Sequence, residues 1–194
     1  MNRPMNPEVL ASFLKQNIQP VEDEIYGNRY RASAQLTDGT YLPCVVFQSR
    51  TKQVQLALRR FKELGMKSKQ FEDVLRTFVS RGSRLSEWQI ASVKESPWAW
   101  PPALLKTIHG ETAMSWTSFV AEMKDGTMHS FGSTFSFEFF ELPDGYSHQD
   151  ISRILSGTVY SAKKGLTPYT IENLNGAIVY RERPYFTCYL DQLG

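Results

Sequence analysis

His129 is the titratable residue in the most unusual setting of this sequence. It follows a predicted turn and lies two residues before Phe131, in a run that alternates like a strand. A histidine beside a small residue at the end of a sheet is suited to act as a general base or to bind a ligand. The alternative is a histidine at the core margin with one ring nitrogen bonded to backbone. No catalytic partner stands at a diagnostic spacing from His129, which favours this structural role.

The other two histidines each precede a carboxylate by two residues, as His109 before Glu111 and His148 before Asp150. Neither arrangement has the spacing of a metal motif, and the sequence holds no CxxC, HExxH or DxDxDG pattern. Nucleophile-elbow, phosphate-loop and dinucleotide fingerprints do not occur either. We therefore expect no metal and no cofactor, and we leave open whether the chain is an enzyme.

A basic stretch covers residues 50–69 and contains Arg59, Arg60 and Lys62, with Glu63 as its one acidic residue. It could form a phosphate-contacting face of a helix-turn-helix, but we favour a solvated helix face. Between residues 111 and 150 the balance reverses, and Lys124 is the one basic residue among seven acidic ones. Such a split of charge suits self-association or a charged protein partner as well as nucleic acid.

Aromatic residues in two places could contact a partner. Trp98 and Trp100 precede two prolines and could form an exposed docking element, although loop aromatics more often anchor the loop to the core. Tyr185 and Tyr189 fall on one face of the last predicted strand, where they could line a pocket; packing is the preferred interpretation.

Two Asp-Gly-Thr turns specify the sheet in detail. Asp38-Gly39 and Asp125-Gly126 each stand between strand-forming runs, which is a strong hairpin signal because glycine accepts a positive φ. A one-residue slip moves every side chain to the other face, so the apolar pattern selects three-residue loops with left-handed glycines. The expected pairs are Met123–Thr127, Ala121–His129 and Phe119–Phe131 in one hairpin, and Ala34–Leu42, Ala32–Cys44 and Tyr30–Val46 in the other.

Helical spacing predicts a helix after the Asn6-Pro7 start signal, two helices with apolar stripes at 54–61 and 71–78, and a short capped helix from Ser147 to Gly157. Residues 84–94 fit a helix or a strand equally well. Further strands are expected at 158–161, 177–181 and 185–190. We predict an α+β fold: an antiparallel sheet built from hairpins with helices packed on one face. Its core should centre on residues 131–139, near Phe119, Leu58, Val74 and Phe78.

The composition indicates a folded chain. With 194 residues, 41% hydrophobic residues and a net charge of +2, it suits a single domain over 1–194, alternatively built from two similar halves, 1–97 and 98–194. No apolar run could span a membrane and no leader is visible, so we expect a cytoplasmic protein without a membrane partner. Cys44 and Cys188 are expected to be buried, reduced thiols.

We expect a soluble, intracellular, non-enzymatic binding protein whose partner is a protein or a small ligand. One alternative is a small enzyme or pocket protein that uses His129. The other is a nucleic-acid binder that uses the basic stretch 50–69, and a homo-oligomer is compatible with each of these.

Overall fold

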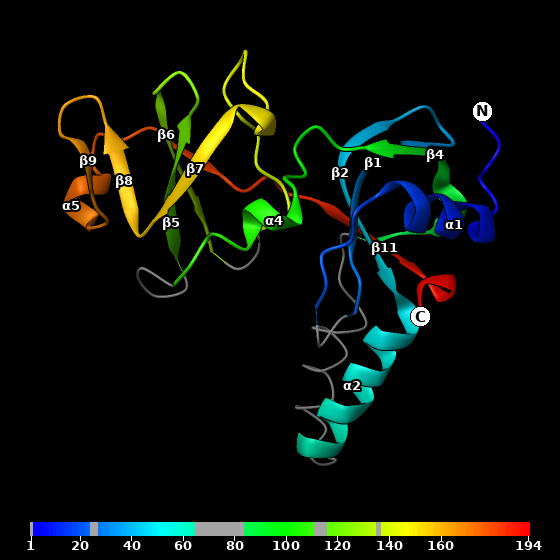
Figure 1. The fold of residues 1–194 in the computed structure, drawn as a ribbon. Coiled ribbons are helices and arrows are strands. Elements are labelled where there is room, and N and C mark those ends of the chain that lie inside the picture. The colour runs from blue at the N-terminus through cyan, green and yellow to red at the C-terminus, as the bar shows by residue number, and fades with distance from the viewer. Residues whose placement is uncertain (1, 24–26, 65–83, 111–115, 135–136) are drawn as a thin grey trace. The chain divides into compact units, whose positions relative to one another are not determined.

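The computed structural model describes residues 2–23, 27–64, 84–110, 116–134 and 137–194, and within α2 it describes only part of the side chains. The chain forms two compact units (Figure 1). Unit 1 comprises Met1–Ser96 together with Tyr185–Gly194, and unit 2 comprises Pro97–Pro184. Unit 2 is thus inserted between β4 and β11 of unit 1. The predicted helix at 71–78, with Val74 and Phe78, lies outside the described residues.

Unit 1 is built on a five-stranded sheet in the order β3-β11-β2-β1-β4. Its strands are β1 (Tyr30–Leu36), β2 (Tyr41–Ser49), β3 (Arg84–Leu85), β4 (Ile90–Glu95) and β11 (Phe186–Leu190). The hairpin β1–β2 and the pair β1–β4 are antiparallel, whereas β11 runs parallel to both β2 and β3. Short 3-10 turns, η2 (Glu87–Gln89) and η4 (Asp191–Leu193), precede β4 and follow β11.

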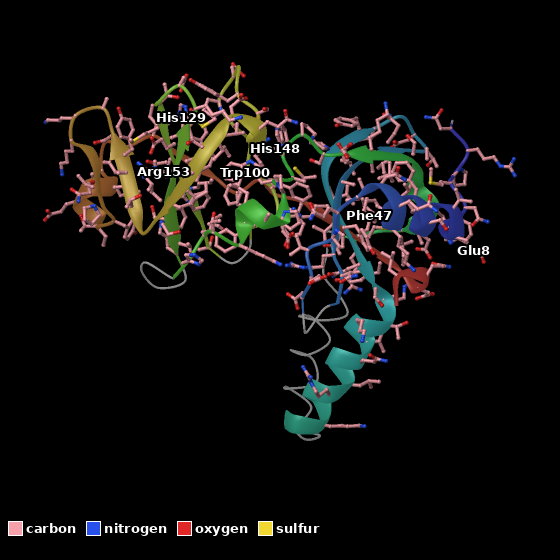
Figure 2. The ribbon with its side chains drawn as sticks, viewed as in Figure 1. Glu8, Phe47, Trp100, His129, His148 and Arg153 are labelled. Carbon is pink, nitrogen blue, oxygen red and sulfur yellow. The ribbon has the colours of Figure 1, made fainter. Side chains whose placement is uncertain are left out.

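Helix α1 (Pro7–Asn17) covers the apolar face of this sheet. The predicted start is confirmed: Pro7 opens the helix, and the Asn6 side chain accepts a hydrogen bond from the Glu8 N–H. Leu10 and Leu14 are fully buried one turn apart, and they pack into the core that contains Phe47 of β2 (Figure 2). An i, i+4 pair on one helix face therefore joins α1 to the sheet.

Helix α2 (Arg50–Leu64) follows β2 without a break and extends away from the sheet (Figure 1). The Ser49 side chain caps its start by accepting a bond from the Lys52 N–H at 3.1 Å. The helix was predicted, but its orientation differs: Val54 and Leu58, assigned to the core, are 44% and 54% exposed.

Unit 2 holds a four-stranded sheet in the order β10-β6-β5-β7 and a two-stranded sheet, β8–β9. The strands are β5 (Thr117–Met123), β6 (Met128–Ser133), β7 (Ile151–Ser156), β8 (Thr158–Ser161), β9 (Gly165–Pro168) and β10 (Val179–Arg181). Strand β10 runs parallel to β6, and the other pairs are antiparallel. Short helices α4 (Pro102–Leu105) and α5 (Ile171–Leu174) and the turn η3 (His148–Asp150) complete the described elements.

Aromatic rings fill the core of unit 2 on one face of its sheet. Phe119 and Phe131 stack with ring centroids 5.6 Å apart, and Trp100 meets Phe131 edge-on at 5.0 Å. Phe140 belongs to the same cluster, which confirms the predicted aromatic centre for Phe119 and Phe131. Phe139 is fully buried as well, but outside this cluster. Leu58, by contrast, belongs to unit 1 and is exposed.

The opposite face of this sheet is covered by the β8–β9 hairpin at one place and by Trp116 at another. Ser130 ties β6 to β8 through two bonds with the Tyr160 backbone, at 3.0 and 2.7 Å. Trp116 lies directly over Gly132, and the Arg181 guanidinium stands 5.1 Å from the Trp116 ring centroid. Gly132 leaves room for the indole because it has no Cβ.

Both three-residue loops are confirmed. Gly39 and Gly126 have φ of 94° and 86°, and β5 pairs with β6 in the predicted register. In the first hairpin Ala34 pairs with Leu42 as expected, but Ala32 pairs with Val45 and Tyr30 with Phe47. Between these pairs β2 has one residue more than β1, which forms a bulge next to Pro43. A bulge is favoured there because proline has no N–H to donate to β1.

Three further corrections concern the predicted elements. The sheets are mixed rather than purely antiparallel, because β10 and β11 join in parallel. Residues 151–156 are strand β7, and the expected helix from Ser147 shrinks to the one-turn η3. The ambiguous segment 84–94 resolves into β3, η2 and the start of β4. Helices are few among the described residues: α1 packs on the sheet of unit 1, and the helices described in unit 2 have four residues each.

Candidate functional site

Helix α2 presents an amphipathic surface to solvent. We call the exposed side chains Lys52, Val54, Leu58, Arg59 and Lys62 the α2 surface. Val54, Leu58 and Lys62 follow one another at intervals of four residues, so they form one stripe along the helix. Lys52 and Arg59 lie beside it, seven residues apart. Of the three predicted basic contact residues, Arg59 and Lys62 are exposed, and the Arg60 side chain lies outside the described part of the helix.

The start of α2 is held to unit 1 through Arg50. Its guanidinium donates to both Glu87 carboxylate oxygens at 3.0 Å and to the Tyr189 carbonyl at 3.1 Å. Asp191 lies 3.5 Å away on the other side. The bonds to Glu87 and Tyr189 come from one terminal nitrogen of the guanidinium, and the other terminal nitrogen faces Asp191, so the planar group contacts both sides at once. Arg50 therefore joins α2 to η2, β11 and η4, and this role is not visible in the sequence, where Glu87 and Asp191 are remote.

The tryptophan loop is anchored to unit 2. Trp100 is completely buried, and its indole N–H donates to the Phe140 carbonyl at 3.1 Å. Trp98 is half-buried beneath Arg183, whose guanidinium carbon is 4.8 Å from the ring centroid. The burial of Trp100 removes it from the predicted docking element, since its ring cannot present a face to a partner. The anchoring alternative fits the structure.

His129 lies on β6 opposite Ala121, as the register predicted. Its half-buried ring meets Tyr146 at 5.3 Å and Tyr180 at 6.0 Å, both edge-on, and its Nε2 is buried without a hydrogen-bond partner. Burial lowers the pKa of His129, and the charge of Asp125 partly opposes this effect. The imidazole is consequently neutral at pH 7.

Asp125 organises the turn beside this histidine. Its carboxylate accepts bonds from the Tyr146 hydroxyl at 2.7 Å and from the Thr127 hydroxyl and N–H at 2.7 and 2.9 Å. These bonds, that of Tyr146 foremost, lower the pKa of Asp125 to about 2. In the cluster of His129, Tyr146, Tyr180 and Asp125, the carboxylate holds the two hydroxyls, whereas the Nε2 of His129 bonds to none of these groups.

The remaining histidines have structural surroundings. His148 lies in η3, where Ser147 and Asp150 form the predicted capping box. His109 is exposed, and its backbone N–H donates to the Ser156 hydroxyl at 2.9 Å. Glu111 lies outside the described residues. Among the residues that the structure describes, no three His, Cys, Asp or Glu side chains gather closely enough to hold a metal ion.

Both cysteines are buried, as expected, and no disulfide joins them. Burial raises the pKa of the Cys188 thiol to about 12, so it is protonated and unreactive in the folded protein. Tyr189, proposed from sequence as a pocket residue, packs under Arg84, whose guanidinium carbon is 4.8 Å from its ring centroid. Tyr185 is half-buried.

No described helix is both long and apolar enough to cross a membrane. Compared with family models, with curated proteins and with solved structures, the chain shows no significant match. Function is therefore inferred from the chain's own geometry.

Proposed function

We propose that the chain is an intracellular, non-enzymatic binding protein, and that it holds an acidic protein partner along the α2 surface. The observation that supports this most strongly is the exposure of Val54 and Leu58, at 44% and 54%, on a helix whose exposed charges are basic among its described side chains. Two apolar side chains four residues apart are typical anchors of a helix that lies in the groove of a partner.

The charges define the chemistry of that partner. Lys62 continues the stripe of the apolar pair, and Arg59 and Lys52 lie to the same side of it; among the described side chains of this surface, every charge is basic. The partner should therefore carry an apolar groove with carboxylates on its rim. Electrostatic attraction would speed association and choose the partner, and the apolar anchors would slow its release.

Arg50 fixes the N-terminal end of helix α2, next to the α2 surface. Because Glu87, the Tyr189 carbonyl and Asp191 hold its guanidinium, the first turn of α2 is already ordered before a partner arrives. Ordering in advance lowers the entropy lost on binding. The other proposals from sequence receive less support: the His129 cluster has no second catalytic group in hydrogen-bond contact, and the tryptophan loop is anchored.

The test measures binding of the whole chain to three fluorescent probes at two salt concentrations. The probes are an acidic amphipathic peptide of Glu and Leu, a 20-base-pair DNA duplex, and vesicles with anionic lipid. We expect the peptide to bind best. Leu58→Ser should weaken it by about tenfold, because a buried leucine contributes about 1.5–3 kcal/mol. Lys62→Glu should weaken binding most at low salt.

Two exposed residues elsewhere in unit 1 provide matched controls. Val9 on α1 is 57% exposed, and Lys94 on β4 is exposed as well. Val9→Ser and Lys94→Glu should leave binding of the peptide unchanged. If these controls weaken binding as much as the α2 variants do, the contact is nonspecific. Preference for the DNA duplex with a steep salt dependence would instead favour the nucleic-acid alternative, and preference for vesicles would favour a membrane surface.

A further inference from the structure

Three segments that are distant in sequence meet at His129 in unit 2. His129 belongs to β6, Tyr180 to β10, and Tyr146 to the loop that leads into η3; the two tyrosine rings lie 6.0 and 5.3 Å from the imidazole. Figure 2 shows His129 on the sheet of this unit. Tyr146 also reaches the β5–β6 turn, where its hydroxyl bonds to Asp125 and Thr127. Tyr146 therefore holds its loop against both the turn and the histidine.

The imidazole lacks a bond that it would need when charged. Nε2 is buried and without a hydrogen-bond partner, which is tolerable for a neutral ring. Protonation gives both ring nitrogens an N–H and adds a positive charge, and a buried, unpaired charge is costly. A proton taken from solvent by His129 must therefore be accompanied by a change in its surroundings.

Asp125 is the anion that can stabilise a positive charge on His129. It is bonded to a neutral phenol in the structure, and its pKa of about 2 keeps it ionised through mildly acidic conditions. Its charge already acts favourably on the protonated form of His129. The Tyr146 phenol already makes a charge-assisted bond to this carboxylate, and an imidazolium would add the attraction between two opposite charges. The imidazolium thus competes with Tyr146 for the same carboxylate.

We propose that protonation of His129 releases Tyr146 from Asp125, so that acidification unlocks residues 141–147 from the β5–β6 turn. The pair acts as a pH-sensitive latch within unit 2, independent of the α2 surface. Because burial places the pKa of His129 below its ordinary value of 6.5, the latch is closed at neutral pH and opens only in acid.

The other groups near the histidine do not supply a competing charge. Ala121 faces it from β5, and the Tyr180 ring contacts it from β10. Glu122 is paired with Arg153 on neighbouring strands, and alternation places both on the opposite face of the sheet. Among the described groups, Asp125 alone exerts a resolved electrostatic effect on His129.

The test is amide hydrogen exchange of the full chain at pH 7.5 and pH 5.0, corrected for the intrinsic rate. Peptides covering 141–147 should exchange about tenfold faster at the lower pH, as expected for a local opening, while those from α1 stay constant. His129→Leu should abolish the response, because the first hairpin already carries leucine at this position in Leu42. Tyr146→Phe should exchange rapidly at both pH values.

His148→Gln is the matched control, because His148 also adjoins the loop but is placed by the η3 capping box. It should keep the wild-type response; loss of the response in this variant, or its persistence in His129→Leu, would overturn the proposal. If His129→Leu does not fold, the wild-type ring signals of His129 and Tyr146 are followed by NMR across the same range. A shared midpoint supports the latch, and separate midpoints refute it.

Discussion

Gly132 allows the sharpest test of packing in this structure. An alanine Cβ at this position would lie 2.0, 2.6 and 2.7 Å from three atoms of the Trp116 indole. Real side chains essentially never approach so closely, so Gly132→Ala must displace the ring or the strand. The indole is rigid, and Arg181 lies on it at 5.1 Å, so the displacement disturbs that contact as well.

Three magnitudes decide the expected size of the effect. Overpacking a well-filled site costs about 1–3 kcal/mol. Loss of an exposed cation–π contact adds about 0.5–1 kcal/mol. In the opposite direction, alanine is better than glycine within a strand by roughly 0.5–1 kcal/mol. The two smaller terms cancel, so the free energy of unfolding of unit 2 should fall by about 2 kcal/mol.

Urea denaturation followed by near-ultraviolet circular dichroism measures this loss, and a double-mutant cycle identifies its cause. In a Trp116→Ala background the clash is absent, so Gly132→Ala should cost little or slightly stabilise unit 2. Wild-type stability of Gly132→Ala would refute the close packing of Trp116 on β6. An equal loss in both backgrounds would show that the effect arises elsewhere.

Four further outcomes are expected. Gly126→Ala should cost about 1–2 kcal/mol in thermal denaturation, because φ is +86° and a Cβ meets nothing there, so backbone strain alone acts. Arg50→Ala should destabilise unit 1 by about 1–2 kcal/mol, and Arg50→Lys should restore only part, because one guanidinium nitrogen contacts Glu87 and the Tyr189 carbonyl while the other faces Asp191, and lysine has a single nitrogen. Cys188 should not react with Ellman's reagent at pH 8 until denaturant is added, because its pKa is about 12. The pKa of Asp125 falls from its usual 3.8 to about 2, so its contribution to stability is present above pH 4 and is lost as the pH falls towards 2; Asp125→Asn should remove that portion of the acid transition.

Three of these outcomes have a specific result that would contradict them. Ready reaction of the Cys188 thiol in native conditions would mean that β11 opens easily. Full rescue by Arg50→Lys would show that one charged nitrogen is enough to hold the start of α2, without simultaneous contacts to Glu87 and Asp191. An unchanged acid transition in Asp125→Asn would assign the stability to other carboxylates.

Local chemistry was the most predictable part of this fold. The two Asp-Gly turns determine loop length and glycine conformation within a few residues, and the apolar pattern then selects the register that pairs Ala121 with His129. Pro43 shows where such reasoning falls short. The missing N–H of proline was visible, but the position at which β2 would accommodate it depends on the neighbouring strand.

Longer-range relationships could not be obtained in this way. Ile151, Ile154 and Leu155 fit a helical face, yet they form an edge strand because β5 offers an unpaired backbone on that side. Nothing in the sequence of β11 indicates that it pairs in parallel with β2 and β3. Its partner residues in β2 are more than 130 residues away in the chain. Val54 and Leu58 illustrate a different limit: a stripe that faces a core and one that faces a partner have the same spacing.

The insertion of unit 2 has a consequence for how the chain can be cut and rejoined. One row of paired residues crosses unit 1, from Glu95 through Ala32 and Val45 to Phe186. The chain leaves unit 1 just after the first of these residues and returns at the last. Three strand spacings separate them, about 14 Å, which roughly five extended residues can bridge. We therefore expect that a short linker can replace unit 2, and that unit 1 would then still form its sheet with all five strands.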